Sequence, residues 1–153
     1  MRYMVNYSSN LPIGRSMNYS FTDDRPIFQQ LAEYLKEDIM NGVYQEGSPI
    51  PSSTQLSVEL KINPATTMKA VNLLVEEGLV EKKRGIGMFV RTGAREEVIM
   101  MKRKTFMNDH IRPLVKAALS LGITEEELTH MVMGGFDQSP TGQSPGVWRR
   151  AEP

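Results

Sequence analysis

The sequence predicts a mainly α-helical fold with one small β-hairpin: a winged helix-turn-helix followed by a short helical region. The first observation is a pair of helix-start signals, Ser52 and Asn63-Pro64, only a few residues apart, as in a helix-turn-helix. The second is a change of apolar spacing after Gly78, where two short strand-like runs flank the Gly-rich turn Arg84–Gly87. A hairpin in this position is the wing of a winged helix-turn-helix.

Length and composition limit the number of domains and the classes of protein to which the chain can belong. The chain has 153 residues, 40% hydrophobic and 24% charged, which is typical of one compact domain with an accessory element. It contains no cysteine, so disulfides, iron–sulfur clusters and thiol catalysis are excluded. It also contains neither an apolar run of the roughly 20 residues that span a bilayer nor a signal-peptide core. We therefore expect a cytoplasmic protein without membrane attachment.

The first helix is expected to begin near Pro26, because proline suits the first helical turn, and to end at Gly42. One apolar stripe runs along it at every fourth position: Ile27, Leu31, Leu35 and Ile39. Before it, residues 1–16 are polar and irregular, and we expect a flexible N-terminal extension there. Met17 is an alternative start, so the winged domain is expected to span residues 17–92.

Two further helices form the helix-turn-helix. Ser52 can cap the second helix while Gln55 reaches back to it, a capping box, and Leu56 and Leu60 are expected to face inward. Asn63 followed by Pro64 is a cap with proline at the first helical position. The third helix is expected to end at Gly78. Its expected buried stripe consists of Met68, Val71, Leu74 and Val75.

The hairpin strands are expected at Leu79–Lys83 and Met88–Arg91. After Gly93 the helical pattern returns, and residues 93–135 are expected to form a helical dimerisation region. Its near-heptad stripe consists of Met100, Met107, Ile111, Leu114, Ala118 and Leu121. Pro113 should kink or break this helix at about Arg112.

A short last helix is expected at the C-terminal end of this region. Thr124 and Glu127 form a capping box at its start, and Gly134-Gly135 is expected to end it. Residues 136–153 are rich in Ser, Pro, Gly and Gln, which predicts a disordered tail.

Five segments between Pro26 and Val90 carry a likeness to a known family in their order and spacing: Pro26–Leu31, Ile50–Ser52, Ile62–Thr67, Leu74–Val80 and Arg84–Val90. On these segments the block resembles the GntR family of winged-helix repressors, and the short helical C-terminal part looks like the YtrA subfamily. The resemblance implies a sequence-specific DNA-binding regulator, expected to repress transcription as a homodimer on an inverted-repeat operator in double-stranded DNA, with no cofactor. A small-molecule effector is a further expectation that no residue identifies.

Three groups of residues are candidates for DNA contact. A helix N-terminus attracts phosphate, the start of the third helix would enter the major groove, and glycines let a basic wing approach the duplex. Each group has a plainer interpretation: a cap for Ser52, a solvated surface lysine for Lys69, and an ordinary charged hairpin tip for the wing. The candidates are Ser52, Ser53 and Thr54; Asn63, Pro64, Ala65, Thr66 and Lys69; and Lys83, Arg84, Gly85 and Gly87.

Alternatives to this function remain at two points. The Met100–Leu121 stripe could pack back on its own winged domain instead of a second copy. The chain could also be a winged-helix protein-interaction module without DNA binding, because its formal net charge is zero and Thr54 and Lys69 stand where the family commonly has Arg. The two histidines, His110 and His130, form no pair at metal-ligand spacing, so neither an enzyme nor a metal site is expected.

Overall fold

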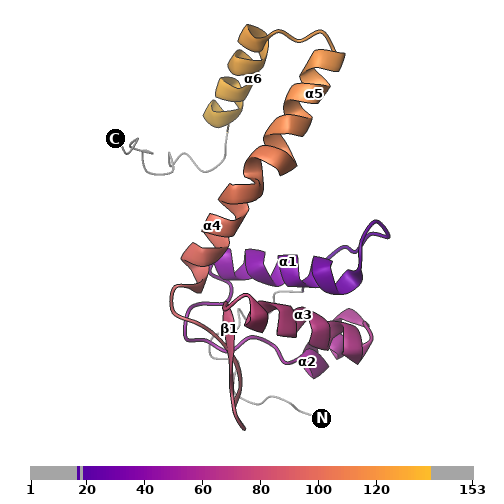
Figure 1. The fold of residues 1–153 in the computed structure, drawn as a ribbon, viewed down its shortest axis with the longest axis vertical. Helices are drawn as coiled ribbons and strands as arrows, with labels where there is room; N and C mark the ends of the chain where they lie inside the picture. Colours follow the sequence, from indigo (N-terminus) through magenta and orange to yellow (C-terminus); the bar gives the residue numbers. More distant parts are fainter. Residues whose placement is uncertain (1–16, 18, 139–153) are drawn as a thin grey trace. The chain divides into compact units, whose positions relative to one another are not determined.

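The computed structural model describes Met17 and residues 19–138, so the extension predicted for residues 1–16 lies outside these described residues. Of the tail predicted for residues 136–153, residues 139–153 also lie outside them, whereas Phe136 and Asp137 are helical, so the prediction was wrong for these two residues. The chain divides into two compact units, with the boundary between Lys104 and Thr105. Figure 1 shows the elements in chain order. They are α1 (Ile27–Met40), α2 (Ser53–Leu60), α3 (Pro64–Glu76), β1 (Val80–Lys83), β2 (Gly87–Val90), α4 (Ala94–Phe106), the π-helix η2 (Met107–Ile111), α5 (Arg112–Ser120) and α6 (Glu125–Asp137).

The core of the first unit lies between α1 and α3, which pack against each other (Figure 1). Ala94 and Val98 of α4 belong to the same buried cluster. The first turns of α4 are therefore part of the winged domain's core. The largest fully buried side chains are Leu31, Leu35, Ile39, Leu56, Leu74, Leu79, Val80, Val90 and Val98.

Ordered chain precedes α1. The ring of Tyr19 stacks on that of Tyr34 with centroids 4.5 Å apart, and Phe21 meets Tyr34 edge-on at 5.8 Å. Gln30, which is buried, donates to the carbonyl of Thr22 and accepts from its backbone N–H. These contacts hold the segment before Pro26 against α1, so the packed domain begins upstream of the first helix.

The wing is a two-stranded antiparallel hairpin in which Val80 pairs with Val90 and Lys83 with Gly87. A third chain segment runs beside β2: the N–H of Ile50 donates to the carbonyl of Met88 at 2.9 Å, and Pro49 forms a bridge with Phe89. The paired residues at the root of the hairpin are buried, whereas its tip is exposed. The wing is therefore anchored at one end to the loop that leads into α2.

The buried face of α3 differs from the predicted stripe. Met68 and Val75 are exposed, so the prediction was wrong for both residues, while Val71 and Leu74 are buried as expected. Thr67 and Ala70 complete the buried face. Thr67 tolerates burial because its hydroxyl donates to the carbonyl oxygens of Ser53, at 2.8 Å, and Pro64, at 3.0 Å. The face of α3 that points to solvent therefore differs from the predicted one and includes Met68 and Val75.

Pro113 does not break the helical region at Arg112. The backbone changes from α4 through the π-helix η2 into α5, and the N–H of Arg112 bonds to the carbonyl of Met107, five residues earlier. A proline ring clashes with the carbonyl four residues before it and supplies no N–H. The wider π turn accommodates this requirement without ending the helix.

Helix α6 begins as predicted, with the capping box of Thr124 and Glu127, but continues past Gly134 and Gly135 to Asp137. The expectation that the two glycines end it was wrong. Glycine lowers helix stability but keeps its N–H and C=O, and neither residue adopts the left-handed conformation that ends a helix.

An ion network joins α1 to the ends of α3 and α4. The Lys36 ammonium, almost buried, lies 2.7 Å from a carboxylate oxygen of Glu33 and 3.1 Å from one of Glu77. Lys102 of α4 approaches Glu37 at 3.2 Å and Glu33 at 3.5 Å. Burial raises the pKa of Glu33, but Lys36 and Lys102 outweigh it, so its pKa lies below the usual 4.5.

We expect the free energy of unfolding of the Lys36→Met variant to be about 2 kcal/mol lower than that of wild type, because Glu77 loses its partner. This value lies between the losses typical of broken buried and exposed ion pairs. Urea denaturation measures the difference. Lys83→Met is the matched control, because its 3.8 Å pair with Glu81 is exposed and should contribute little.

The same network makes the stability difference depend on pH. A carboxylate with a lowered folded-state pKa stabilises the fold above its unfolded pKa, near 4.5 for Glu33, and loses that contribution as pH falls through the folded value. The gap between wild type and Lys36→Met should therefore shrink in acid. A gap that is unchanged from pH 7 to pH 3 would contradict the role given to Glu33.

Candidate nucleic-acid interface

The start of α2 combines a cap with exposed backbone donors. The hydroxyl of Ser52 accepts from the N–H of Gln55 at 3.1 Å, and the Gln55 side chain accepts from the N–H of Ser52 at 2.8 Å. The predicted capping box is therefore present, and it occupies the Ser52 hydroxyl. Ser53 and Thr54 in the first turn are half-buried and exposed, respectively. Any anion at this end would meet backbone N–H groups and these two hydroxyls.

The turn between α2 and α3 is held by local hydrogen bonds. Lys61 adopts the left-handed conformation, with φ 55° and ψ 42°. The N–H of Ile62 donates to the carbonyl of Ser57 at 3.2 Å, and the Ser57 hydroxyl donates back to the carbonyl of Ile62 at 2.6 Å. This pair of bonds sets the direction in which α3 leaves α2.

The first turn of α3 is open to solvent. The side chain of Asn63 accepts from the N–H of Ala65 at 2.8 Å, and Pro64 follows it at the first helical position, as predicted. Asn63, Pro64 and Ala65 are exposed and Thr66 is half-buried. This end of the helix thus presents small side chains and little bulk.

Lys69 is exposed one turn further along α3, but its ammonium does not extend freely. It lies 5.8 Å from the ring centroid of Phe28 on α1, within the range of a cation–π interaction. The interaction draws the charge toward the side of α3 that faces α1. The sequence pattern predicted the exposure of Lys69 but not this partner.

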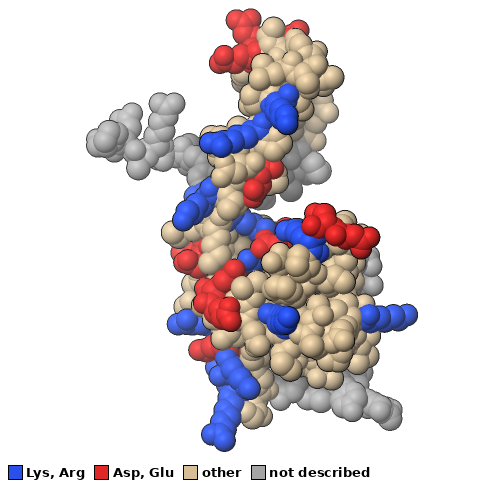
Figure 2. All heavy atoms as spheres, turned by 45° about the vertical axis from the view of Figure 1, so that its right-hand side comes forward, with Lys and Arg blue, Asp and Glu red and all other residues tan. Residues whose placement is uncertain are grey.

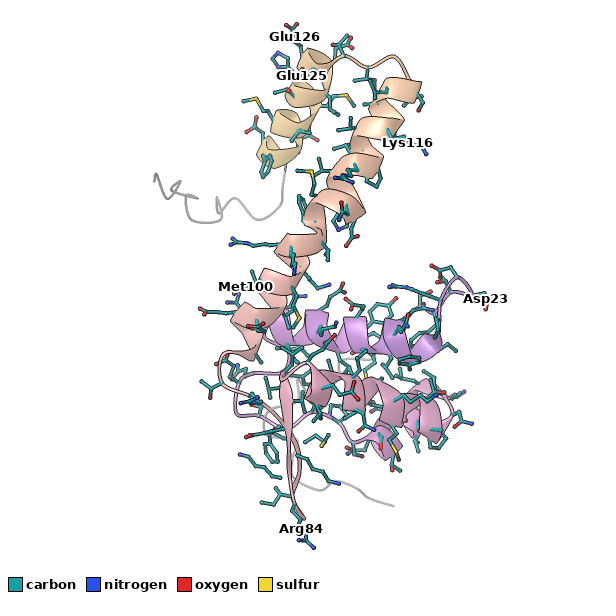
Figure 3. All side chains as sticks on the ribbon, viewed as in Figure 1. Asp23, Arg84, Met100, Lys116, Glu125 and Glu126 are labelled. Carbon is teal, nitrogen blue, oxygen red and sulfur yellow. The ribbon has the colours of Figure 1, made fainter. Side chains whose placement is uncertain are left out.

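The wing carries the predicted basic tip. Arg84 projects at the end of the hairpin (Figure 3), and Figure 2 shows basic side chains protruding at that end of the first unit. Lys83 lies 4.6 Å from the ring centroid of Phe89. Gly85 has φ +75° and Gly87 has φ +143°, values that other residues rarely adopt, so the turn requires both glycines.

Contacts within the first unit link the elements that carry the three predicted groups. Thr67 at the start of α3 contacts Ser53 at the start of α2 through a 2.8 Å hydrogen bond. Pro49, bridged to the wing, lies just before the cap at Ser52. The wing root, the α2 N-terminus and the first turn of α3 therefore keep fixed positions relative to one another.

Besides Val75, sequence reasoning missed the exposed residues Met68 and Asn72 of α3. Met68 was assigned to the core because it is apolar, and Asn72 was not considered. The signal available in the sequence was their spacing from Ala65, because positions three, four and seven residues apart share one helix face.

Other kinds of site find no support in the described part of the chain. No group of three or more His, Cys, Asp or Glu side chains within Met17 and residues 19–138 is arranged to hold a metal ion. No helix there has the length and apolar character needed to cross a bilayer.

Comparisons with known proteins agree with the observed fold. A family model described as bacterial regulatory proteins, gntR family, matches residues 27–90, from the start of α1 to the end of β2. The chain is 29% identical over 103 residues to the HTH-type transcriptional repressor YtrA of Bacillus subtilis (strain 168), covering 67% of this chain and 78% of YtrA. It is 26% identical over 112 residues to the HTH-type transcriptional regulator YhcF of the same strain, covering 73% and 91%.

A solved structure extends the likeness to three dimensions. A GntR family transcriptional regulator from Listeria monocytogenes superimposes with a TM-score of 0.62 at 25% identity, covering 74% of this chain and 98% of that one. Residues 27–90 make up less than half of this chain, whereas the superposition covers 74% of it. The likeness therefore reaches beyond the winged region into the helices that follow it.

Replacing Ser52 by Ala should lower the free energy of unfolding by about 1 kcal/mol, because the α2 cap is lost. Ser53→Ala is the matched control and should leave stability nearly unchanged, since only the Ser53 backbone carbonyl takes part in the contact with Thr67. Thermal unfolding followed by circular dichroism compares the two. Equal losses in both variants would show that the Ser52 hydroxyl does not act as the cap.

Proposed function

We propose that this chain is a transcriptional repressor that binds an inverted-repeat operator as a homodimer. The premise is that its winged helix-turn-helix, at residues 27–90, belongs to the gntR family of bacterial regulatory proteins. The chain is a DNA-binding transcriptional regulator of that family. Repression is the proposed direction because the relative YtrA is a repressor. The observation that carries the proposal is the exposed first turn of α3, which is held to the start of α2 by the Thr67–Ser53 hydrogen bond, together with the exposed basic tip of the wing.

Each part of this surface has a distinct task in the proposed complex. The N-terminal end of α3 enters the major groove, where Ala65 and Thr66 lie near base edges. The N–H groups at the start of α2, with Ser53 and Thr54, bind a backbone phosphate. Arg84 neutralises a phosphate or enters the adjoining minor groove, and the glycines beside it let the wing backbone approach.

A homodimer supplies the second half-site. One winged domain makes few phosphate contacts, and useful specificity needs two. The predicted stripe in the helical region supports self-association, because Met100, Met107, Leu114 and Leu121 are exposed. Ile111 is half-buried and Ala118 is buried, and both share a helix face with Leu114, so part of the predicted stripe is already covered within the chain. In this proposal residues 93–135 act as the dimerisation region.

The apolar surface continues on α6. Its exposed apolar side chains are Met131, Val132, Met133 and Phe136. A helix with apolar residues around much of its circumference is more often covered than solvated. The second copy of the chain is therefore proposed to cover α6 as well as α5.

The Arg84→Ala variant should bind all duplex sequences more weakly and by a similar factor, because a phosphate contact carries no sequence information. The slope of log affinity against log salt should fall by about 1. Fluorescence anisotropy on in vitro selected DNA measures both. Lys116→Ala, on α5 of the second unit, is the matched control and should change neither (Figure 3).

Two outcomes would contradict the proposed DNA contact. The first is a wild-type protein that does not bind duplex DNA at low salt. The second is a slope of log affinity against log salt near zero for the wild-type protein. A shallow slope with a protein partner would instead favour the winged-helix interaction module.

Leu114→Glu should shift the protein from dimer toward monomer, because a charge replaces an apolar side chain at the proposed contact. Analytical ultracentrifugation measures the shift, and circular dichroism checks that the helices persist. Lys116→Gln makes the same change in formal charge two residues away, on the opposite side of α5, and should leave the dimer intact. A folded Leu114→Glu variant with unchanged association would contradict the proposed interface.

A further inference from the structure

The outward face of α3 follows from what its two sides touch. The Thr67 hydroxyl bonds to Ser53, so one side of α3 faces α2, and the Lys69 ammonium lies over Phe28, so the other side faces α1. At 3.6 residues per turn, Ala65 and Asn72 lie between these sides and point away from the core. Met68 lies on the flank next to α2, and Lys69 on the flank next to α1.

Met68 and Asn72 form an exposed pair on this face. They are four residues apart, so their side chains are neighbours on the helix surface. Met68 is 53% exposed although it is large and apolar. Asn72 is exposed, and its amide makes no side-chain hydrogen bond with the part of the chain that the structure describes. Neither residue belongs to the buried core or to the partly buried side chains that pack against it.

The side chains of Met68 and Asn72 are chemically suited to contact A·T base pairs. In the major groove an adenine presents its N7 acceptor and N6 donor, to which an Asn amide binds with two hydrogen bonds. A thymine presents its C5-methyl group, which takes an apolar contact. A thioether adapts its shape to such a contact. Adenine and thymine of one pair, or of adjacent pairs, offer both features side by side.

We propose that Met68 and Asn72 together determine sequence preference by reading A·T pairs in each half-site, with Asn72 on adenine and Met68 on the thymine methyl group. The proposal rests on the proposed function, since it requires α3 to lie in the major groove. It assigns Lys69 a different task. Phe28 draws the Lys69 charge to the opposite flank, where a phosphate of the groove wall is the fitting partner.

The test uses the full chain and modified DNA. The wild-type protein first selects its sequence from a random duplex library. Each thymine of the half-site is then replaced by deoxyuridine, which lacks only the methyl group, and each adenine by 7-deazaadenine, which lacks the N7 acceptor. Affinities are measured for wild type, Met68→Ala and Asn72→Ala, with Lys69→Ala and Val58→Ala as controls. Val58 is exposed on α2 and tests apolar truncation away from α3.

The proposal expects two selective losses. At one thymine, deoxyuridine should weaken wild-type binding by about fourfold, the effect of one buried methyl group, and should not weaken Met68→Ala. At a neighbouring adenine, 7-deazaadenine should weaken wild type by about tenfold and should not weaken Asn72→Ala. Lys69→Ala should bind less tightly yet keep both losses, and Val58→Ala should match wild type.

The outcomes separate this inference from the function on which it rests. A wild-type protein that selects and binds no duplex would overturn the proposed function. Tight wild-type binding with the same analogue losses in Met68→Ala and Asn72→Ala would leave that function standing and overturn the assignment of the pair. A selected half-site without A·T pairs would overturn it too. All four substituted side chains are exposed, so circular dichroism should show folded variants.

Discussion

The rotation of α3 about its own axis is the constraint on which the interface depends. Thr67, Ala70, Val71 and Leu74 point into the core, and the Thr67 hydroxyl is held by the carbonyl of Ser53 at 2.8 Å. This bond joins the two helices of the helix-turn-helix at their starts. A rotation by one residue position would bury Met68 and turn Thr67 outward. The residues offered to a partner are therefore decided by packing inside the domain.

The elements of the fold could be predicted from the sequence because their ends carry local chemical signals. Ser52 with Gln55, Asn63 with Pro64 and Thr124 with Glu127 each satisfy free backbone groups within a few residues, so no distant contact is needed to place them. The face of α3 could not be predicted in the same way. Hydropathy assigns Met68 inward and Thr67 outward, whereas the buried threonine is satisfied by a carbonyl on another helix. The π turn before Pro113 and the continuation of α6 past Gly134 likewise depend on backbone hydrogen bonds that side-chain patterns do not reveal.

The same limit applies to the candidate site. Motif and position placed Arg84 at the tip of the wing and Lys69 on the exposed part of α3. They did not predict Phe28 beneath Lys69, because that contact joins residues that are distant in the sequence. An exposed lysine that has an aromatic partner differs from a freely solvated one, since its charge is directed to one flank of the helix. The division of α3 into a flank with Lys69 and a flank with Met68 is thus a property of the tertiary structure.

A formal net charge of zero is compatible with a DNA-binding surface because opposite charges are unevenly placed. Glu33, Glu37 and Glu77 lie in the ion network with Lys36 and Lys102, so much of their negative potential is offset locally. At the wing, Glu81 lies 3.8 Å from Lys83, whereas Arg84 projects at the tip of the hairpin (Figure 3). Interactions between exposed charges fade over about 10 Å in salt solution, so a phosphate near the wing senses Arg84 far more than acidic groups elsewhere in the chain. The sum of charges over the whole chain therefore does not describe the potential at the tip of the wing.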